Sequence, residues 1–127
     1  FDCVYPTRCG RNARAITRAG ELNLRAARFK LDTAPVDAAC DCYVCRHYTR
    51  AYLAHLFRAG EMLGATLLSY HNISVLLDLT AQARGAIERG EWAAWRDRTL
   101  REFGDERAAA VAATPGFAAD CAENVGP

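Results

Sequence analysis

Residues 40–45 read CDCYVC and place three cysteines within six positions. Three thiols this close cannot all pair with one another as disulfides, whereas a divalent metal needs several such groups around one point. The stretch therefore predicts a metal site in which Cys40, Cys42 and Cys45 are three of the ligands. A tetrahedral zinc ion would require a fourth ligand from elsewhere in the chain.

Two of the histidines make poor fourth ligands. His47 lies only two residues beyond Cys45 and would need a tight, strained wrap of the chain. His55 falls on a predicted helix face shared with Tyr48 and Tyr52, where an aromatic surface cluster is the more ordinary interpretation.

His71 remains, in the first turns of a predicted long helix. A loop of cysteines docked against that helix would complete a tetrahedral shell of Cys40, Cys42, Cys45 and His71, and four protein ligands leave no open position for chemistry. The alternative for His71 is a buried histidine satisfied by hydrogen bonds. Beside three cysteines that lack one ligand, we predict a structural zinc ion.

Composition limits the class of protein. The chain has 127 residues, 51% of them hydrophobic, which suffices for one domain or a piece of one. No long apolar run and no signal-peptide pattern is present, so we predict a soluble, cytoplasmic protein without a membrane partner. Six cysteines could form a secreted disulfide scaffold, but the long helices predicted here favour reduced thiols. The chain starts at Phe1, within a predicted strand, which suggests the C-terminal piece of a larger fold.

Charge is distributed unevenly. Residues 1–58 carry 10 basic and 5 acidic side chains, while residues 59–127 carry 6 basic and 10 acidic ones. Arginine suits phosphates and base edges, so a polyanion near the first half is one interpretation. A solvated basic face without a ligand is the other.

The pattern predicts a strand followed by a hairpin in the first 30 residues. FDCVY resembles a buried strand that ends at Pro6, and PTRCGRN resembles a loop. AIT, a turn at RAG, and ELNL predict a β-hairpin.

Helices dominate the rest of the predicted layout. Residues 31–48 are expected to be irregular, and Thr49 is expected to cap a helix that ends at Gly60. A longer helix is predicted over residues 67–89, ended by Gly90, and another over residues 92–103. Beyond Gly104 we expect fraying or disorder.

Two short patterns at the start are weak by themselves. Asp2 follows a strand-like apolar residue, and a carboxylate there is more often a buried hydrogen-bond acceptor than a nucleophile. PTRCGRN offers two arginines and a glycine that could approach phosphates or bases.

Together the motifs closely resemble one family. FDCVYPTRCGRN, LNLRAARF, CDCYVC, RAYLAHLFRAGEMLG and HNI recur in this order in the bacterial tRNA-guanine transglycosylases, also called queuine tRNA-ribosyltransferases. The resemblance covers about residues 1–103. Ala13 departs from it, because the family usually has glycine after RN, and so does Ala26, where asparagine is usual.

The resemblance implies an α/β fold, the C-terminal part of a (β/α)8 barrel with a zinc-binding subdomain. This chain would be mostly helical, with a strand and a β-hairpin at its start. We expect the last barrel strands and the active-site and RNA-binding loop in residues 1–30, the zinc subdomain in residues 31–71, C-terminal barrel helices in residues 72–103 and a flexible tail in residues 104–127. Active sites of such barrels lie at the C-terminal ends of the strands.

The resemblance also implies the chemistry. Members exchange guanine at the wobble position of tRNAs with a GUN anticodon for a 7-deazaguanine base, 7-aminomethyl-7-deazaguanine or queuine, in queuosine biosynthesis. Asp2 would be the catalytic nucleophile that attacks C1′ of the ribose, with net retention after two displacements. Cys3 would line the base pocket, and no cofactor would be consumed. The segment contacting the anticodon loop would be Thr7, Arg8, Cys9, Gly10 and Arg11.

The family's second catalytic aspartate has no counterpart here, so we expect the chain alone to be inactive. The family also tends to dimerise near the zinc subdomain, and Tyr48, Tyr52 and His55 are candidates for a homodimer contact, although packing within the chain is an equal alternative. The competing functional hypothesis is a non-catalytic zinc module or partner subunit that binds RNA or protein.

Overall fold

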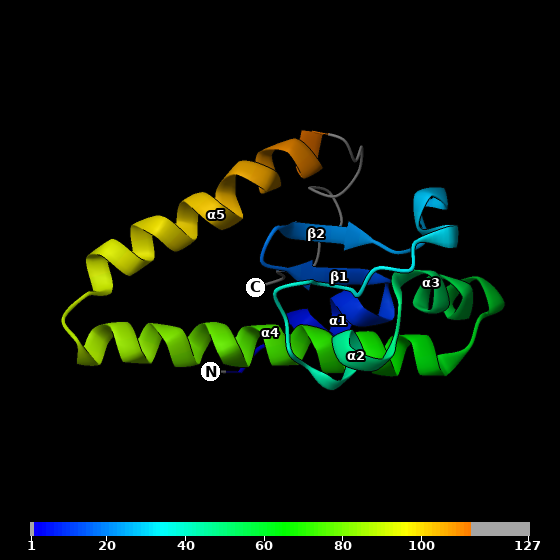
Figure 1. Cartoon of the computed structure of the whole chain (residues 1–127), viewed down its shortest axis with the longest axis horizontal. Helices are drawn as coiled ribbons and strands as arrows, with labels where there is room; N and C mark the ends of the chain where they lie inside the picture. Colours follow the sequence, from blue (N-terminus) through cyan, green and yellow to red (C-terminus); the bar gives the residue numbers. More distant parts are fainter. Residues whose placement is uncertain (1, 113–127) are drawn as a thin grey trace, which may run out of the picture.

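The computed structural model describes residues 2–112, which form a helical body around one β-hairpin (Figure 1). The elements in chain order are α1 (Tyr5–Arg11), β1 (Arg14–Thr17), β2 (Gly20–Asn23), the 3-10 helix η1 (Ala27–Leu31), α2 (Tyr43–His47), α3 (Arg50–Ala59), α4 (Met62–Glu88) and α5 (Trp92–Ala112). The hairpin lies over α1 and α4, and α5 runs back from the far end of α4 toward β2 (Figure 1). Among the described residues, no helix combines the length and apolarity needed to span a membrane.

The predicted strand over FDCVY is wrong in this structure. Residues 2–4 have no regular secondary structure, and α1 begins at Tyr5 and continues through the predicted PTRCGRN loop. Pro6 fits the first turn of a helix, where its missing N–H is not needed. A strand also needs a neighbour to pair with, and within residues 2–112 β1 and β2 pair only with each other.

The predicted hairpin is confirmed. β1 and β2 are antiparallel, with Thr17 opposite Gly20 and Arg14 opposite Asn23. Gly20 has a φ of 105°, which the tight turn requires and glycine adopts freely. Ala13, just before β1, has a φ of 60°, so a residue with a Cβ occupies the left-handed region.

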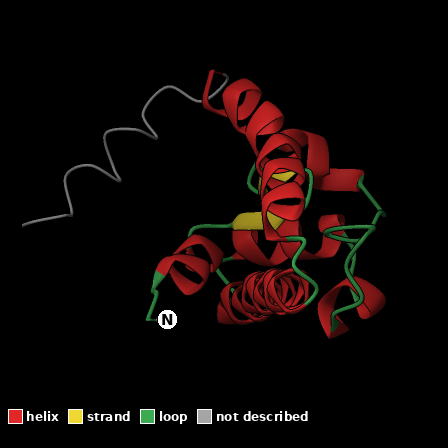
Figure 2. Ribbon diagram, turned by 90° about the vertical axis from the view of Figure 1, so that its left-hand side faces the viewer, coloured by secondary structure: helices red, strands yellow, loops and turns green. Residues whose placement is uncertain are grey.

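The predicted start and end of α3 are confirmed. The Thr49 side chain accepts a hydrogen bond from the Tyr52 N–H, and Gly60 ends the helix with a φ of 75°. α4 starts at Met62, earlier than predicted, and Gly90 follows its end with a φ of 71°. Figure 2 looks nearly along this helix and shows the two strands and a long helix above it, with shorter helices on either side.

The last helix differs from the prediction. α5 continues to Ala112 instead of ending at Phe103. The alanine-rich composition of residues 104–112 explains this, because alanine is the best helix former and one Gly costs only about 1 kcal/mol. The rest of the predicted flexible tail, residues 113–127, lies outside the described residues.

The hydrophobic core lies between the hairpin, η1, α3 and the first half of α4. Its buried members include residues of β1, η1, α2, α3 and α4, so the loop that carries the cysteines packs against the core. They are Ala13, Ala15, Leu24, Phe29, Val36, Val44, Leu53, Ala54, Leu56, Phe57, Leu67 and Leu68.

Candidate metal centre and the segment beside it

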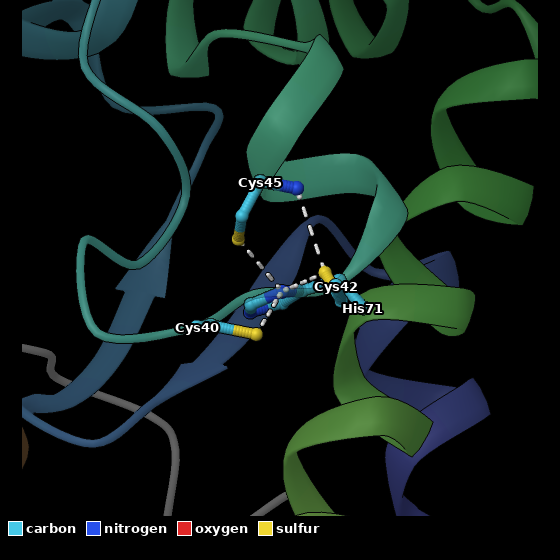
Figure 3. A group of neighbouring side chains, drawn as sticks. All are labelled: Cys40, Cys42, Cys45 and His71. Atoms are coloured by element: carbon cyan, nitrogen blue, oxygen red, sulfur yellow. Dashed lines mark hydrogen bonds between the residues drawn. The ribbon is translucent and has the colours of Figure 1, made fainter.

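The structure brings together the three cysteines and the histidine predicted from the sequence (Figure 3). Cys40 lies in the loop before α2, Cys42 caps α2, Cys45 lies within it, and His71 projects from α4. The four ligand atoms all lie within 4.8 Å of one another. Nδ1 of His71 is 3.9 Å from Sγ of Cys40, 3.4 Å from Sγ of Cys42 and 3.3 Å from Sγ of Cys45.

These spacings fit a tetrahedral zinc ion. With Zn–S bonds of about 2.3 Å and a Zn–N bond of about 2.0 Å, the sulfur-to-nitrogen edge of the tetrahedron is about 3.5 Å. The three sulfur-to-nitrogen distances in this structure lie on both sides of that value. Three thiolates and one imidazole close the coordination shell, so the ligand set is that of a structural zinc ion without a position for substrate.

Burial also affects the protonation of three of these side chains. Burial raises the pKa of the Cys40 and Cys45 thiols, so these sulfurs do not readily carry charge without compensation. Burial lowers the pKa of His71, which keeps the imidazole neutral and able to coordinate. A divalent cation bound by these residues would supply the compensating charge and displace the thiol protons.

The ring of His71 is held by the β-hairpin. Nε2 lies 3.0 Å from the carbonyl oxygen of Ile16, and because a carbonyl can only accept, Nε2 carries the hydrogen. Nδ1 is then the unprotonated nitrogen and faces the three sulfurs. The metal centre and β1 therefore share one ligand side chain.

Asn72 follows His71 on α4 and is fully buried. Its Oδ1 accepts a hydrogen bond of 2.8 Å from the Ile16 N–H, while its Nδ2 donates to the carbonyls of Pro6 at 3.0 Å and Arg14 at 2.9 Å. One amide thus joins α4 to both α1 and β1. Both backbone polar groups of Ile16 are bonded to consecutive side chains of the same helix.

A second set of contacts fixes the loop that carries Cys40. The buried carboxylate of Asp37 accepts hydrogen bonds of 2.9 Å from the N–H groups of Arg18 and Ala39. The Arg50 guanidinium donates twice to the Val36 carbonyl, at 3.2 and 3.1 Å. The stretch predicted to be irregular over residues 31–48 contains the short helix α2, and these polar contacts hold its residues 36–39.

The remaining histidines lie away from the four converging side chains. His47 is exposed and packs on the ring of Tyr43, with centroids 4.5 Å apart. His55 is exposed on α3. The aromatic cluster predicted near it is present, since the rings of Tyr48 and Tyr52 stack with centroids 5.4 Å apart.

In the segment before the hairpin, the predicted site residues differ in their exposure to solvent. Asp2 and Cys3 are exposed, as are Arg8 and Arg11 in the last turn of α1. The other three residues of the predicted RNA segment are less accessible: Thr7 is half-buried, and Cys9 and Gly10 are buried.

Sequence reasoning missed Asn72 and Asp37 as the side chains that position the site. Asn72 had a signal, because an amide next to the predicted ligand in an otherwise apolar helix needs partners when buried. Asp37 had none, since a carboxylate in an irregular loop is ordinarily a surface residue.

Comparison with known proteins gives the family. The family model for queuine tRNA-ribosyltransferase matches residues 1–105. The chain therefore belongs to the queuine tRNA-ribosyltransferase family.

Curated relatives support the same family assignment. A queuine tRNA-ribosyltransferase of Natranaerobius thermophilus is 48% identical over 103 residues, which cover 81% of this chain and 28% of the relative. One of Thiobacillus denitrificans is 57% identical over 88 residues, covering 69% of this chain and 24% of the relative. One of Thermus thermophilus is 53% identical over 107 residues, which cover 84% of this chain and 28% of the relative. The chain thus spans about a quarter of the length of these relatives.

Proposed function

We propose that this chain carries the nucleophile, the anticodon-contacting segment and the structural zinc centre of a tRNA-guanine transglycosylase. The observation that carries the proposal is the family match over residues 1–105. The four converging zinc-type ligands in CDCYVC and His71 support it independently. The substrates would be tRNAs with a GUN anticodon and a 7-deazaguanine base, and a cytoplasmic location would follow from that substrate.

The proposed chemistry uses Asp2 as nucleophile. Its carboxylate oxygen bonds to C1′ of the ribose at position 34, the bond from C1′ to guanine breaks, and guanine leaves after taking up a proton. The incoming deazaguanine loses a proton and displaces Asp2, so two inversions give net retention. The exposed position of Asp2 is compatible with access to a large substrate. Cys3 would line the base pocket.

Arg8 and Arg11 are the proposed contacts to the splayed anticodon loop. Both are exposed on α1, whereas Cys9 and Gly10 are buried and would act by holding the helix against α4. Tyr48, Tyr52 and His55 are the proposed homodimer contact. Their support is the stacking of Tyr48, which follows α2, on Tyr52 of α3, together with the exposure of His55.

The test is a chimera with the Thermus thermophilus relative, which is 53% identical over the shared region. Residues 1–105 of this chain replace the matching part of that protein. With hairpin RNA carrying a GUN loop, the chimera should exchange labelled guanine and form a covalent adduct resistant to denaturation. Asp2→Asn should abolish both and retain zinc, whereas Asp97→Asn, at an exposed aspartate of α5, should change neither. Exchange by the Asp2→Asn chimera would reject the assignment.

The same chimera decides between this proposal and a non-catalytic zinc module. A zinc-loaded, folded chimera that forms no adduct and exchanges no guanine would favour a module that binds RNA or protein without chemistry.

A further inference from the structure

Five basic side chains form what we call the basic strip: Arg8, Arg11, Arg25, Arg28 and Lys30. All five are exposed, and none makes an ion pair with any described residue. Arg8 and Arg11 belong to the segment assigned above to the anticodon loop. Arg25, Arg28 and Lys30 have no role in that assignment.

The two parts of the strip are joined through the backbone. Leu24, immediately before Arg25, donates its N–H to the Ala13 carbonyl at 2.9 Å. The end of α1 and the start of the segment that leads into η1 are therefore neighbours. Figure 1 shows the chain passing from β2 to the light-blue turn of η1 beside α3. This backbone contact brings the segment after α1 close to the segment that carries Arg25, Arg28 and Lys30.

Aromatic rings restrain two of these side chains. The Arg25 guanidinium lies 5.9 Å from the ring centroid of Phe57, and the Arg28 guanidinium lies 4.7 Å from that of Phe29. Both rings are buried parts of the core. Cation–π contacts to fixed rings limit the rotamers of the two arginines, so less entropy is lost when they bind an anion.

The acidic side chains on the same elements are occupied by other partners. Glu21 accepts a hydrogen bond from the Tyr5 hydroxyl and lies 3.8 Å from Arg14. Asp32 is paired with Arg50 at 3.2 Å. By contrast, Arg96 on α5 is paired with its neighbour Asp97. No ion pair with a described acidic side chain compensates the positive charge of the strip, in contrast to Arg96.

We propose that Arg25, Arg28 and Lys30 bind the phosphate backbone of the RNA beside the loop that Arg8 and Arg11 contact. The inference rests on the proposed function and extends it to a second RNA surface. Phosphate contacts fix the register of a nucleic acid without reading its sequence. Each contact releases counterions, so the contribution of the three side chains depends steeply on salt.

The test measures binding of hairpin RNA to the zinc-loaded full chain by fluorescence anisotropy at several salt concentrations. The variant Arg25→Gln/Arg28→Gln/Lys30→Gln should bind about 10-fold or more weakly near 0.1 M salt. Its slope of log affinity against log salt should fall by about 2 to 3, or 0.7 to 0.9 per lost phosphate contact. The loss should be equal for a hairpin with GUN in its loop and for one without it.

A matched control removes the same charge elsewhere. Arg84→Gln/Arg98→Gln/Arg101→Gln changes three exposed arginines of α4 and α5 that make no ion pair with described residues, and its slope should match the unmodified chain. Arg25→Lys/Arg28→Lys keeps the charge and should keep most of the slope. Unchanged zinc content and circular dichroism show that each variant is folded.

Three results would overturn the inference: no RNA binding by the unmodified chain, equal slope changes in both triple variants, or competition by polyglutamate as strong as that by RNA, which would indicate a surface for acidic proteins. Guanine exchange by the chimera tests the proposed function separately. If the chimera exchanges guanine but the Arg25→Gln/Arg28→Gln/Lys30→Gln variant keeps the salt slope of the unmodified chain, only the role of the basic strip is rejected. If that variant has a reduced salt slope but the chimera exchanges no guanine, only the catalytic assignment is rejected.

Discussion

Gly10 of α1 and Ser69 of α4 meet with no room for a side chain between them. A Cβ on Gly10 would lie 2.5 Å from Oγ, 2.7 Å from N and 2.8 Å from Cα of Ser69. Two of these three atoms belong to the backbone of a long helix and cannot move aside. The close crossing therefore sets how far α1, with Arg8 and Arg11, stands from α4.

Gly10→Ala should destabilise the fold by about 3 kcal/mol, because the methyl group must separate two packed helices. The check is the free energy of unfolding in urea, monitored by circular dichroism. Gly85→Ala is the control. It makes the same change within α4, where the nearest atom is the flexible guanidinium of Arg89 at 3.0 Å, and should stabilise by up to about 1 kcal/mol. Similar effects of the two substitutions would contradict the packing described here.

Ala13→Gly should leave stability nearly unchanged, within about 0.5 kcal/mol. The left-handed φ of 60° costs an alanine about 1 to 2 kcal/mol, and removing that cost offsets the loss of a buried methyl group and the added freedom of the unfolded chain. Ala54→Gly, at an equally buried alanine in the middle of α3, should cost about 2 kcal/mol because nothing offsets it. A loss at Ala13 as large as that at Ala54 would show that no such strain exists.

Asn72→Leu should cost at least about 3 kcal/mol. The Ile16 N–H and the carbonyls of Pro6 and Arg14 would each lose a partner, at roughly 1 kcal/mol or more per group. Asn12→Leu is the comparison, since the exposed Asn12 amide bonds only the Arg8 carbonyl, and it should change stability by less than about 1 kcal/mol. Urea unfolding of the zinc-loaded chains measures both, and a small effect at Asn72 would refute its linking role.

The chain should contain one zinc ion, measured by elemental analysis after purification without chelators. Removing zinc with a strong chelator should cause a large loss of helical signal, because binding energy at such a site is folding energy. His71→Ala should weaken zinc retention by a large factor, whereas His47→Ala and His55→Ala, both at exposed positions, should retain zinc fully. Protein that contains no zinc but has the full helical signal would refute the structural role of the metal.

Much of the local structure could be predicted from the sequence. The hairpin follows from two short strand-like runs separated by a turn that includes Gly20, and α3 follows from its Thr49 cap and Gly60. Each feature depends on residues close in sequence. The association of the cysteines with His71 could also be predicted, because three thiols without a fourth ligand restrict the choice to few residues.

The first residues could not be predicted in the same way. FDCVY has the composition of a strand, but composition does not provide the neighbouring strand that pairing requires. In this structure Pro6 instead starts a helix, and Asn72, far along the sequence, bonds the Pro6 carbonyl and fixes that arrangement. Likewise, the inward position of Cys9 and Gly10 depends on contact with α4, which no local pattern encodes.

The adjacency of His71 and Asn72 connects the metal centre to α1 through the backbone of Ile16. A ligand that orders α1 would act through Asn72 on the same backbone that orients the imidazole. Linkage is reciprocal, so the factor by which the ion tightens that ligand is the factor by which the ligand tightens the ion. We therefore expect zinc loss to weaken binding at α1, and we expect a ligand bound to α1 to slow the loss of zinc.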